Sequence, residues 1–448
     1  MLIKHARVIP CDETNQIIDD GFIKIKNGTI TDLGDCSHLD NETNGEEIID
    51  ASGSIVMPSS ICAHTHFYGA FARGLYIPGE APDAFPNILE KLWWRLDKSL
   101  NQDAIYYSAL VCLIDAIKHG TTLLFDHHAS PSYIKNSLDI IAKAVLETRL
   151  KVSLCYEVTD RNGLKETEAG IQENLRFIDR INKDKNILDH MSAMFGLHAS
   201  LTLSDDTLKR VTDVCPSGIG FHIHAAEHSV DQYDSINKSG MRVVERLDKF
   251  GILGDKTILA HCVHVDAREI ELLAEKAVIV THQPRSNMNN AVGLPEIESM
   301  MRAGINVCLG NDGFSNSMWQ EWSAAYLGHK LWYRDPRRMP ADLIYKMAIT
   351  HNRNLANTQF TGKETGIIKK GAAADLIMVD YKPFTELTKE NLPWHIVFGF
   401  RESMIQMTMV DGIILNKNGV LTDLDEQVIN KEASKVSQAV WNTYHKYF

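Results

Sequence analysis

The sequence lacks the features that mark membrane-embedded, secreted and nucleic-acid-binding proteins. It has no apolar stretch near the roughly 20 residues that a membrane-spanning helix needs. Asp12 and Glu13 come too early for a signal peptide. Acidic residues outnumber basic ones, and the net charge of −12 disfavours nucleic acid and anionic membranes as partners. We therefore expect a cytoplasmic protein that binds neither a membrane nor a nucleic acid.

Paired cysteines are also missing. None of the eight cysteines forms a CxxC pair, and several lie in apolar runs where a thiol behaves as a small core residue. The composition is otherwise ordinary for a globular protein, with 44% apolar and 23% charged residues. This pattern is typical of a protein from a reducing compartment. The cysteines are Cys11, Cys36, Cys62, Cys112, Cys155, Cys215, Cys262 and Cys308.

The chain is too long for one ordinary hydrophobic core. Its 448 residues allow a barrel of roughly 250 residues and a smaller second domain. Residues 1–56 and 364–424 share a pattern of short strands and turns, such as the hairpin turn at Asn27-Gly28. Because chain ends often lie close together, we expect these two segments to form one composite β-domain. Residues 57–363 are then the barrel, and residues 425–448 are a C-terminal helix.

Between the two ends, eight short β-branched or apolar runs alternate with helical stretches. This alternation predicts a parallel (β/α)8 barrel, because open doubly wound sheets rarely need eight strands. The predicted fold class is therefore α/β, a TIM barrel with a small β-sandwich-like domain formed from both chain ends. The runs are Ile55–His66, Thr121–His128, Lys151–Val158, Ser192–Ala199, Gly218–Ala225, Thr257–His264, Ala277–His282 and Asn306–Asp312.

Histidines gather where these runs end. Active sites of such barrels lie at the carboxyl ends of the strands, and ten of the nineteen histidines fall at the predicted ends. Chance placement would spread them over helices and loops, so a single metal site is the economical explanation. The ten are His64, His66, His127, His128, His198, His222, His224, His261, His264 and His282.

Four strand-end residues have the chemistry of a metal site. His64 and His66 are two residues apart, so the period of a strand points both side chains to the same side. His224 adds a third imidazole, and Asp312 adds a carboxylate. Three imidazoles and one carboxylate, with a position left for water, suit one Zn²⁺ ion or, alternatively, one Fe²⁺ ion. The competing interpretation is a purely structural cluster of buried, hydrogen-bonded histidines.

Two further residues are candidates for catalysis. Glu227 follows His224 by three residues and can face a water on the metal without being a ligand. Alternatively, it is a carboxylate favoured by the dipole at a helix start. His261 ends an apolar strand, where an unpaired imidazole would be costly, so it could bond the attacking water or the substrate. The third and fourth runs do not end in lysine, which disfavours a second metal bridged by a carbamylated lysine.

The ordered strand-end motifs resemble the amidohydrolase superfamily. They are His64-x-His66, His224-x-x-Glu227, His261 and Asn311-Asp312-Gly313, and the likeness extends over nearly the whole chain to residues 371–376. Within the superfamily, the match is to the aminohydrolases, which include guanine deaminase, adenosylhomocysteine deaminase and the chlorohydrolases. The resemblance implies a hydrolase that acts on carbon–nitrogen bonds other than peptide bonds.

Other segments resemble the aminohydrolases named SsnA, which implies a setting in bacterial purine or related nitrogen catabolism. Two positions depart from the pattern: that group favours Asn where Thr65 stands, and the superfamily usually has Thr where Asn311 stands. Neither departure removes a ligand, so the implied mechanism is unaffected, whereas the tuning by residues around the ligands differs. The segments are 92–97, 126–131, 159–163 and 285–290.

With these residues, the resemblance to the aminohydrolases implies hydrolytic deamination of a small amino-substituted heterocycle, such as a purine, pyrimidine or pterin-like ring. The metal lowers the pKa of water toward neutrality, and Asp312 takes the proton. Glu227 then protonates a ring nitrogen, and His261 stabilises the developing oxyanion. Two alternatives stay open: hydrolysis of a cyclic amide or a halide at the same site, and a non-catalytic scaffold.

Loops after the strands supply candidates for the substrate pocket. Phe67 and Trp93, with Trp94, could wall a flat ring, although at least one tryptophan is expected in the core. Arg285 could bind a ring carbonyl or carboxylate, or only hold its own loop. A homo-oligomer is the general expectation for such a protein. The polar candidates are His128, His198, His282 and Arg285.

Overall fold

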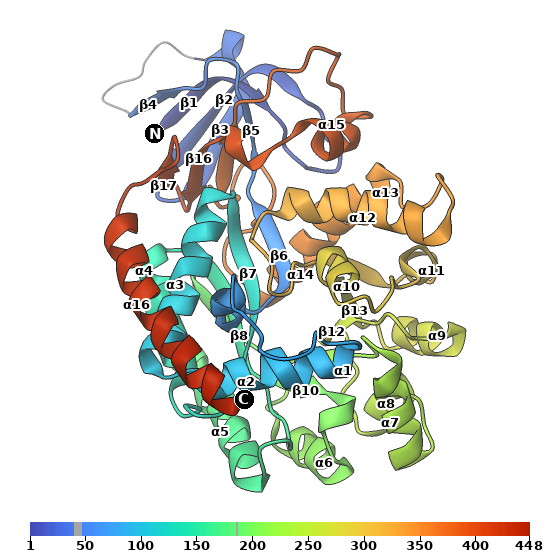
Figure 1. Ribbon diagram of the computed structural model, residues 1–448. Coiled ribbons are helices and arrows are strands. Elements are labelled where there is room, and N and C mark those ends of the chain that lie inside the picture. Colours follow the sequence, from blue (N-terminus) through green and yellow to red (C-terminus); the bar gives the residue numbers. More distant parts are fainter. Residues whose placement is uncertain (40–46, 185–186) are drawn as a thin grey trace.

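The structure is a computed structural model that describes residues 1–39, 47–184 and 187–448. Figure 1 shows a ring of strands surrounded by helices, with a separate sheet at one end of the ring, at the top of the view. The ring consists of β6 (Ser60–Thr65), β7 (Thr121–His128), β8 (Lys151–Tyr156), β9 (Met191–Ala193) with β10 (Phe195–Ala199), β11 (Phe221–Ala225), β12 (Ile258–His261), β13 (Ile279–His282) and β14 (Asn306–Leu309).

Hydrogen bonds close the ring at two seams. Parallel pairing runs from β6 to β9 and from β10 to β14. One seam joins the end of β8 to β10, and the other joins β14 to β6. The predicted (β/α)8 barrel is therefore confirmed. The seam bonds are Val158 N to Gly196 O (3.2 Å), His198 N to Val158 O (2.9 Å), Asn311 N to His64 O (3.0 Å) and His66 N to Asp312 O (2.9 Å).

The second seam depends on a glycine. A Cβ at Gly310 would lie 2.8 Å from both the backbone N and the backbone O of His64. Only glycine therefore lets the end of β14 approach β6 this closely. The close approach places Asp312 beside His64 and His66.

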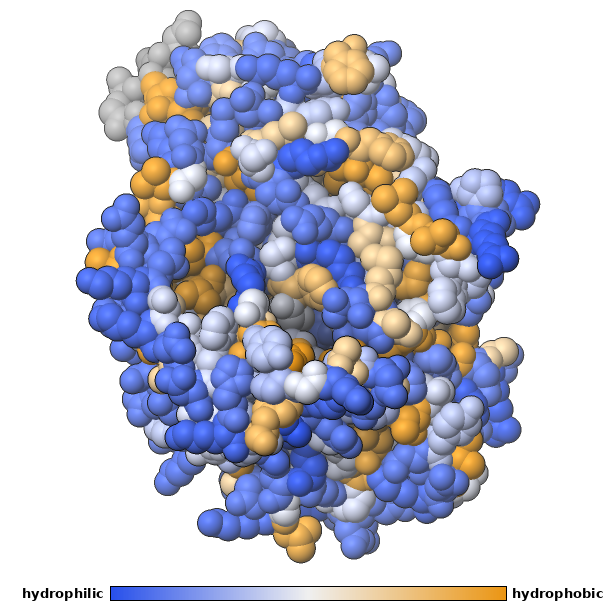
Figure 2. All heavy atoms as spheres, viewed as in Figure 1, coloured by the Kyte–Doolittle hydropathy of each residue, from blue (hydrophilic) through white to orange (hydrophobic). Residues whose placement is uncertain are grey.

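Helices cover the outside of the barrel, and hydrophilic side chains cover most of the face seen in Figure 2. All eight residues of β7 are buried, because this strand lies between the barrel interior and the helices. None of the helices in the described ranges combines the length and the apolar character needed to cross a membrane. The main helices are α3 (Gln102–Lys118), α4 (Ser137–Thr148), α5 (Leu164–Lys183), α6 (Asp205–Val214), α7 (Ser229–Ser239), α8 (Val243–Lys249), α9 (Ala267–Glu275), α10 (Pro284–Asn289), α11 (Ile297–Arg302), α12 (Met318–Tyr333), α13 (Ala341–Tyr345), α14 (Asn352–Gln359), α15 (Leu392–Gly399) and α16 (Glu426–Tyr444).

The first predicted run forms two strands rather than one. The run breaks at Ser59: β5 (Ile55–Pro58) pairs with β1 and β15 outside the barrel, and β6 enters the barrel. Apolar residues stand on both sides of Ser59 and Ser60, so the hydrophobic pattern alone does not show that two strands are present. Pro58 is the physical signal, since proline has no backbone N–H with which to continue a ladder.

Strands from both chain ends form one nine-stranded sheet, in the order β18-β17-β16-β15-β5-β1-β2-β3, with β4 beside β1. The sheet curls, because Ile30 N in β3 donates to Ala372 O (2.9 Å), just before β15. The division of the chain at residues 56, 363 and 424 stays a prediction, and residues 40–46 of the first segment lie outside the described residues. The strands are β1 (Leu2–Val8), β2 (Ile18–Lys26), β3 (Thr29–Asp35), β4 (Ile48–Asp50), β5, β15 (Leu376–Val379), β16 (Ile405–Val410), β17 (Ile413–Lys417) and β18 (Val420–Leu421).

Short helical turns connect β6 to α3, and α16 holds them in place. Tyr444 Oη donates to Lys91 O (2.6 Å), and Trp441 Nε1 donates to Phe71 O (2.8 Å). In Figure 1, α16 (red) runs beside α3 and ends near α2. The connection therefore has a fixed course over the barrel. Its turns are η2 (Phe67–Ala72), α1 (Phe85–Ile88), the π-helical η3 (Leu89–Trp93), α2 (Trp94–Leu96) and η4 (Asp97–Ser99).

A buried ion pair joins the barrel to the end sheet. Lys151 Nζ, at the amino end of β8, lies 2.6 Å from Asp375 Oδ2, and both side chains are almost fully buried. Asp411 Oδ2 is 3.3 Å from the same nitrogen. Burial alone would raise the pKa of Asp375, but the Lys151 ammonium holds it below its ordinary value. Lys151 is thus a structural cation at the end of the barrel opposite to the strand ends that carry the histidines.

Replacing Lys151 with methionine is expected to lower the free energy of unfolding by about 3–5 kcal/mol, because two buried carboxylates lose their cation. The control is Lys183→Met, which breaks an exposed pair with Asp179 and should cost less than about 1 kcal/mol. Urea denaturation of both variants measures the difference. Equal losses in the two variants would contradict the assignment.

Candidate active site

Four side chains converge at the carboxyl ends of the barrel strands. His64 and His66 come from β6 and the residue after it, His224 comes from β11, and Asp312 follows β14. One ligand atom from each lies within 4.8 Å of the others. Asp312 Oδ1 is 3.3 Å from His64 Nε2 and 3.0 Å from His66 Nε2, and His66 Nε2 is 3.1 Å from His224 Nε2. The structure thus brings together the four residues that the sequence predicts as metal ligands.

Each of these rings is anchored through its other nitrogen. His64 Nδ1 lies 2.8 Å from His222 Nε2, His66 Nδ1 donates to His127 O (2.6 Å), and His224 Nδ1 donates to His198 O (2.9 Å). The three Nε2 atoms are therefore turned toward a common centre. Fixing the outer ring nitrogen in this way sets the tautomer that a metal needs.

A second group of possible ligands shares two of these rings. It contains His66, His127, Glu157 and His224. The Nδ1 atoms of His66 and His224 already donate to backbone carbonyls, so each ring has only Nε2 left for a metal. The Glu157 carboxylate lies 3.2 Å from His127 Nδ1 and 3.6 Å from His224 Nδ1. We therefore interpret Glu157 as an anion that orients the two rings, and the geometry favours one metal.

Glu227 and His261 lie beside this centre, and two asparagines orient them. Asn290 Nδ2 donates to Glu227 Oε1 (3.3 Å), and Asn287 Nδ2 donates to His261 Nδ1 (2.8 Å). Glu227 Oε2 is 3.6 Å from His261 Nε2. Burial, together with the nearby Asp312 carboxylate, raises the pKa of Glu227 well above its ordinary value. Burial also lowers the pKa of His261 to about 4, so this ring is neutral and its Nε2 carries the hydrogen.

Asp312 is held in an unusual backbone conformation. Its φ is +59°, in the left-handed region, and His261 (+74°) and Cys262 (+49°) share this feature. Such conformations are costly for residues other than glycine and persist where surrounding structure enforces them.

The Asp312 side chain is held by hydrogen bonds. Ser286 Oγ donates to Asp312 Oδ2 at 2.5 Å. Burial alone would raise the pKa of Asp312, but hydrogen bonds from His64 and His66 lower it well below its ordinary value.

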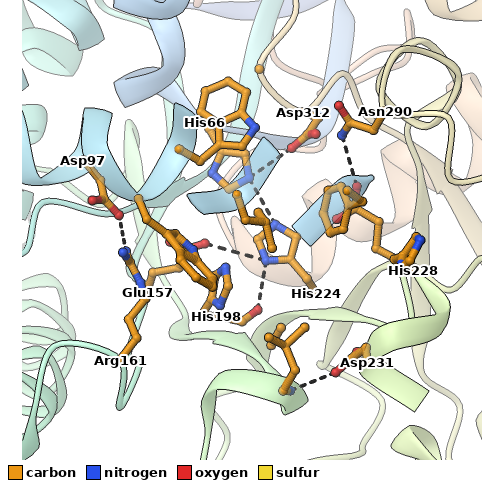
Figure 3. Close-up of a pocket in the computed structure, with 18 of the residues that line it drawn as sticks. His66, Asp97, Glu157, Arg161, His198, His224, His228, Asp231, Asn290 and Asp312 are labelled. Atoms are coloured by element: carbon orange, nitrogen blue, oxygen red, sulfur yellow. Dashed lines mark hydrogen bonds and ion pairs between the residues drawn. The ribbon is translucent and has the colours of Figure 1, made fainter. Parts of the chain in front are cut away.

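A pocket opens onto these groups (Figure 3). In the view of Figure 3, His66 and His224 lie at its centre, Asp97 and Arg161 lie to the left, and Asp312 and Asn290 lie to the upper right. The pocket therefore combines apolar walls with polar groups on two sides. Its walls include Phe85, Leu89, Trp93, Trp94 and Leu201, and its polar lining includes Asp97, Glu157, Arg161, His198, Glu227, His228, Asp231 and Asn290.

Two of the six predicted substrate contacts, Trp93 and His198, line this pocket, and the other four lie outside its lining. Phe67 is fully buried, and His128 Nε2 is 2.9 Å from Ser130 Oγ. His282 Nε2 lies 3.0 Å from His329 Nε2, so it faces a covering helix rather than the pocket. Arg285 forms an ion pair with Glu321 (2.5 Å), which matches the alternative that it holds its own loop.

Several lining and orienting residues have no role in the sequence-based prediction. They are Ser286, Asn287, Asn290, His222, Glu157, Asp97, Arg161 and His228. A signal existed for some of them, because segments 92–97, 159–163 and 285–290 belong to the SsnA-like motifs. The sequence did not indicate which side chains in those segments face the centre.

The protein-family model described as "Amidohydrolase family" matches residues 55–415. The chain belongs to the amidohydrolase family. The match spans all the barrel strands and the predicted ligands, so the predicted superfamily is confirmed.

The similarity of this amidohydrolase to its relatives extends over nearly the whole of both chains. A 5′-deoxyadenosine deaminase from Methanosarcina mazei is 31% identical over 444 residues, which cover 98% of each chain. A 5-methylthioadenosine/S-adenosylhomocysteine deaminase from Acetivibrio thermocellus is 29% identical over 448 residues, which cover 98% of this chain and 99% of the relative. A solved structure of an adenosine deaminase from Xanthomonas campestris with bound zinc has a TM-score of 0.85 at 20% identity, and the match covers 98% of both chains.

These comparisons confirm two predictions about this amidohydrolase. One is the fold, and the other is the class of hydrolase that acts on carbon–nitrogen bonds other than peptide bonds. The family and the donor cluster also support a divalent metal ion. The nearer resemblance to SsnA, the cytoplasmic location and the homo-oligomer stay predictions.

Proposed function

We propose that this amidohydrolase hydrolyses the amino group from a small heterocycle, with one zinc ion as its cofactor. The observation that carries the proposal is the convergence of four metal-binding donors with Glu227 and His261 beside a pocket, where burial raises the pKa of Glu227 and lowers that of His261. An acid and a neutral hydrogen-bond donor next to a metal are what hydrolysis of a carbon–nitrogen bond requires. The relatives named as deaminases of adenine nucleosides support the same reaction on an amino-substituted heterocycle.

The donor set fits a divalent ion. His64 Nε2 is buried and lies 3.3 Å from Asp312 Oδ1, while the Nε2 atoms of His66 and His224 face each other at 3.1 Å. A cation held by His64, His66, His224 and Asp312 satisfies all of these atoms. Zinc is the first choice because imidazole and carboxylate groups are among its usual ligands, and Fe²⁺ is the alternative. When bound, the ion supplies Lewis acidity that lowers the pKa of water.

The protein's own groups move the protons. Asp312, fixed by Ser286, can take a proton from the attacking water. Burial raises the pKa of Glu227, which favours its protonated form as a donor to a ring nitrogen next to the reacting carbon. His261 Nε2–H can donate to the oxygen on which negative charge develops. Ammonia then leaves with a proton relayed by Asp312 or Glu227.

Trp93, Trp94 and Phe85 would hold a flat ring between apolar walls, and His198 would contact its edge. We propose that the four candidates outside the lining support the site rather than touch substrate. Arg285 does so by holding α10, which carries Ser286, since its guanidinium also donates to Ser315 O (2.7 Å).

The test is ammonia release by zinc-loaded protein from a panel of rings. The panel contains 5′-deoxyadenosine, 5-methylthioadenosine, guanine, cytosine and pterin. Release from at least one ring, lost when zinc is removed, is the expected result. If no ring of the panel releases ammonia although zinc is confirmed as bound, the proposal is overturned. Chloride release from a chlorinated ring, or opening of a cyclic amide, would then identify the alternative hydrolase.

A further inference from the structure

A second polar group lies in the pocket, apart from the metal-binding residues. Asp97 and Arg161 form an ion pair within the lining, and both side chains are nine-tenths buried or more. The Arg161 guanidinium lies 5.3 Å from the ring centre of Trp94. In Figure 3 this pair lies on the other side of His66 and His224 from Asn290. A ring that presents its amino group at the metal would turn its far edge toward the pair.

Four atoms of this group are buried without a partner in the described ranges. They are Asp97 Oδ1, Arg161 Nε, Arg161 Nη1 and Trp94 Nε1. Buried polar atoms are rarely left unpaired, because each loses its bonds to water. Four of them on three adjacent side chains that line one pocket are explained by a ligand that completes their hydrogen bonds.

The balance of donors and charge identifies the chemistry of that ligand. Three of the free atoms are donors and one is an acceptor, so the ligand must present oxygen and also one N–H or O–H group. Asp97 neutralises Arg161, and Glu157 adds a second negative charge to its surroundings. A carboxylate on the ligand would therefore meet net repulsion. A neutral lactam edge, with a C=O beside a ring N–H, matches the arrangement.

We propose that Trp94, Asp97 and Arg161 form a subsite for the lactam edge of an amino-oxo heterocycle. The carbonyl oxygen accepts from Arg161 and Trp94, and the ring N–H donates to Asp97 Oδ1. The proposal rests on the proposed deamination and names the substrate class of that site. Arg161 is then a specificity-determining residue rather than a proton-transfer group.

The test is calorimetric binding to zinc-loaded Glu227→Gln protein, which should bind rings without turning them over. Cytosine is compared with 4-aminopyrimidine, and guanine with 2-aminopurine, because the members of each pair differ in the lactam edge. In at least one pair, the lactam member should bind at least about tenfold more tightly, because its absence leaves buried donors unpaired. In Arg161→Lys, which keeps the ion pair but loses the planar fork, the preference should fall below about threefold.

Equal affinities within both pairs would overturn the subsite, as would absence of binding or a preference that Arg161→Lys leaves unchanged. If Arg161→Lys fails to fold, Trp94→Phe replaces it, since phenylalanine keeps the ring contact and removes only Nε1. A preference that Trp94→Phe leaves unchanged would also count against the proposal. Ammonia release by the parent protein tests the reaction separately, so failure of the subsite and failure of the proposed function give different results.

Discussion

Glu227→Gln is expected to lower kcat for ammonia release by about 10³-fold while the metal stays bound. Glutamine keeps the size of the side chain and can still bond Asn290, but it has no acidic proton to donate. Loss of a positioned acid typically removes 10²–10⁴-fold of rate. Because Glu227 is not among the four predicted ligands, zinc per chain should remain at one, as measured by mass spectrometry.

The matched control is Glu271→Gln on the exposed face of α9, which should leave kcat within about twofold because surface substitutions rarely act at a distance. A Glu227→Gln protein that keeps its zinc and its kcat would show that another group protonates the ring. A protein that loses its zinc would show instead that Glu227 helps to hold the metal.

Asp312→Asn is expected to have a larger effect, lowering kcat/KM by about 10⁴-fold, the upper end of the range for a lost proton acceptor. The variant also removes the one negative charge among the four donors, so zinc affinity should fall as well. Asparagine is tolerated at positive φ, and Ser286 can bond its amide, so the fold should survive.

Activity and zinc content of Asp312→Asn are measured together over a range of zinc concentrations. The control is Asp206→Asn at the exposed start of α6. Activity that returns to the parent level at high zinc would contradict the role of Asp312 in proton transfer, because only ligation would then have been lost.

The metal cluster could be predicted from sequence because two simple rules of strand geometry place its residues together. Barrel strands end on one face, and a spacing of two residues puts His64 and His66 on the same side of their strand. The same rule explains the misplaced candidates. His282 also ends a strand, but its ring faces His329 on α12, since adjacent strand positions point to opposite faces. The sequence predicted that His282 lies at a strand end, but it did not determine whether the ring faces the barrel interior or the surrounding helices.

The rest of the pocket could not be predicted, because loops bring it together. Asp97 and Arg161 are 64 residues apart. Both lie in connections between strands, where apolar and polar residues do not alternate at a regular spacing that would show which side chains face the pocket. The course of the segment after β6 is set by contacts with α16, more than 300 residues later. The break at Ser59 was also not predicted, because apolar residues stand on both sides of Ser59 and Ser60. In each case long-range packing determines the position.

The most direct test of the central claim is to titrate metal-free protein with zinc while measuring ammonia release from the best ring of the panel. The account predicts no release without metal, a linear rise with added zinc, and saturation at one zinc per chain. Full activity of the metal-free protein, or saturation only at two zinc ions per chain, would contradict a deaminase built on one ion held by His64, His66, His224 and Asp312.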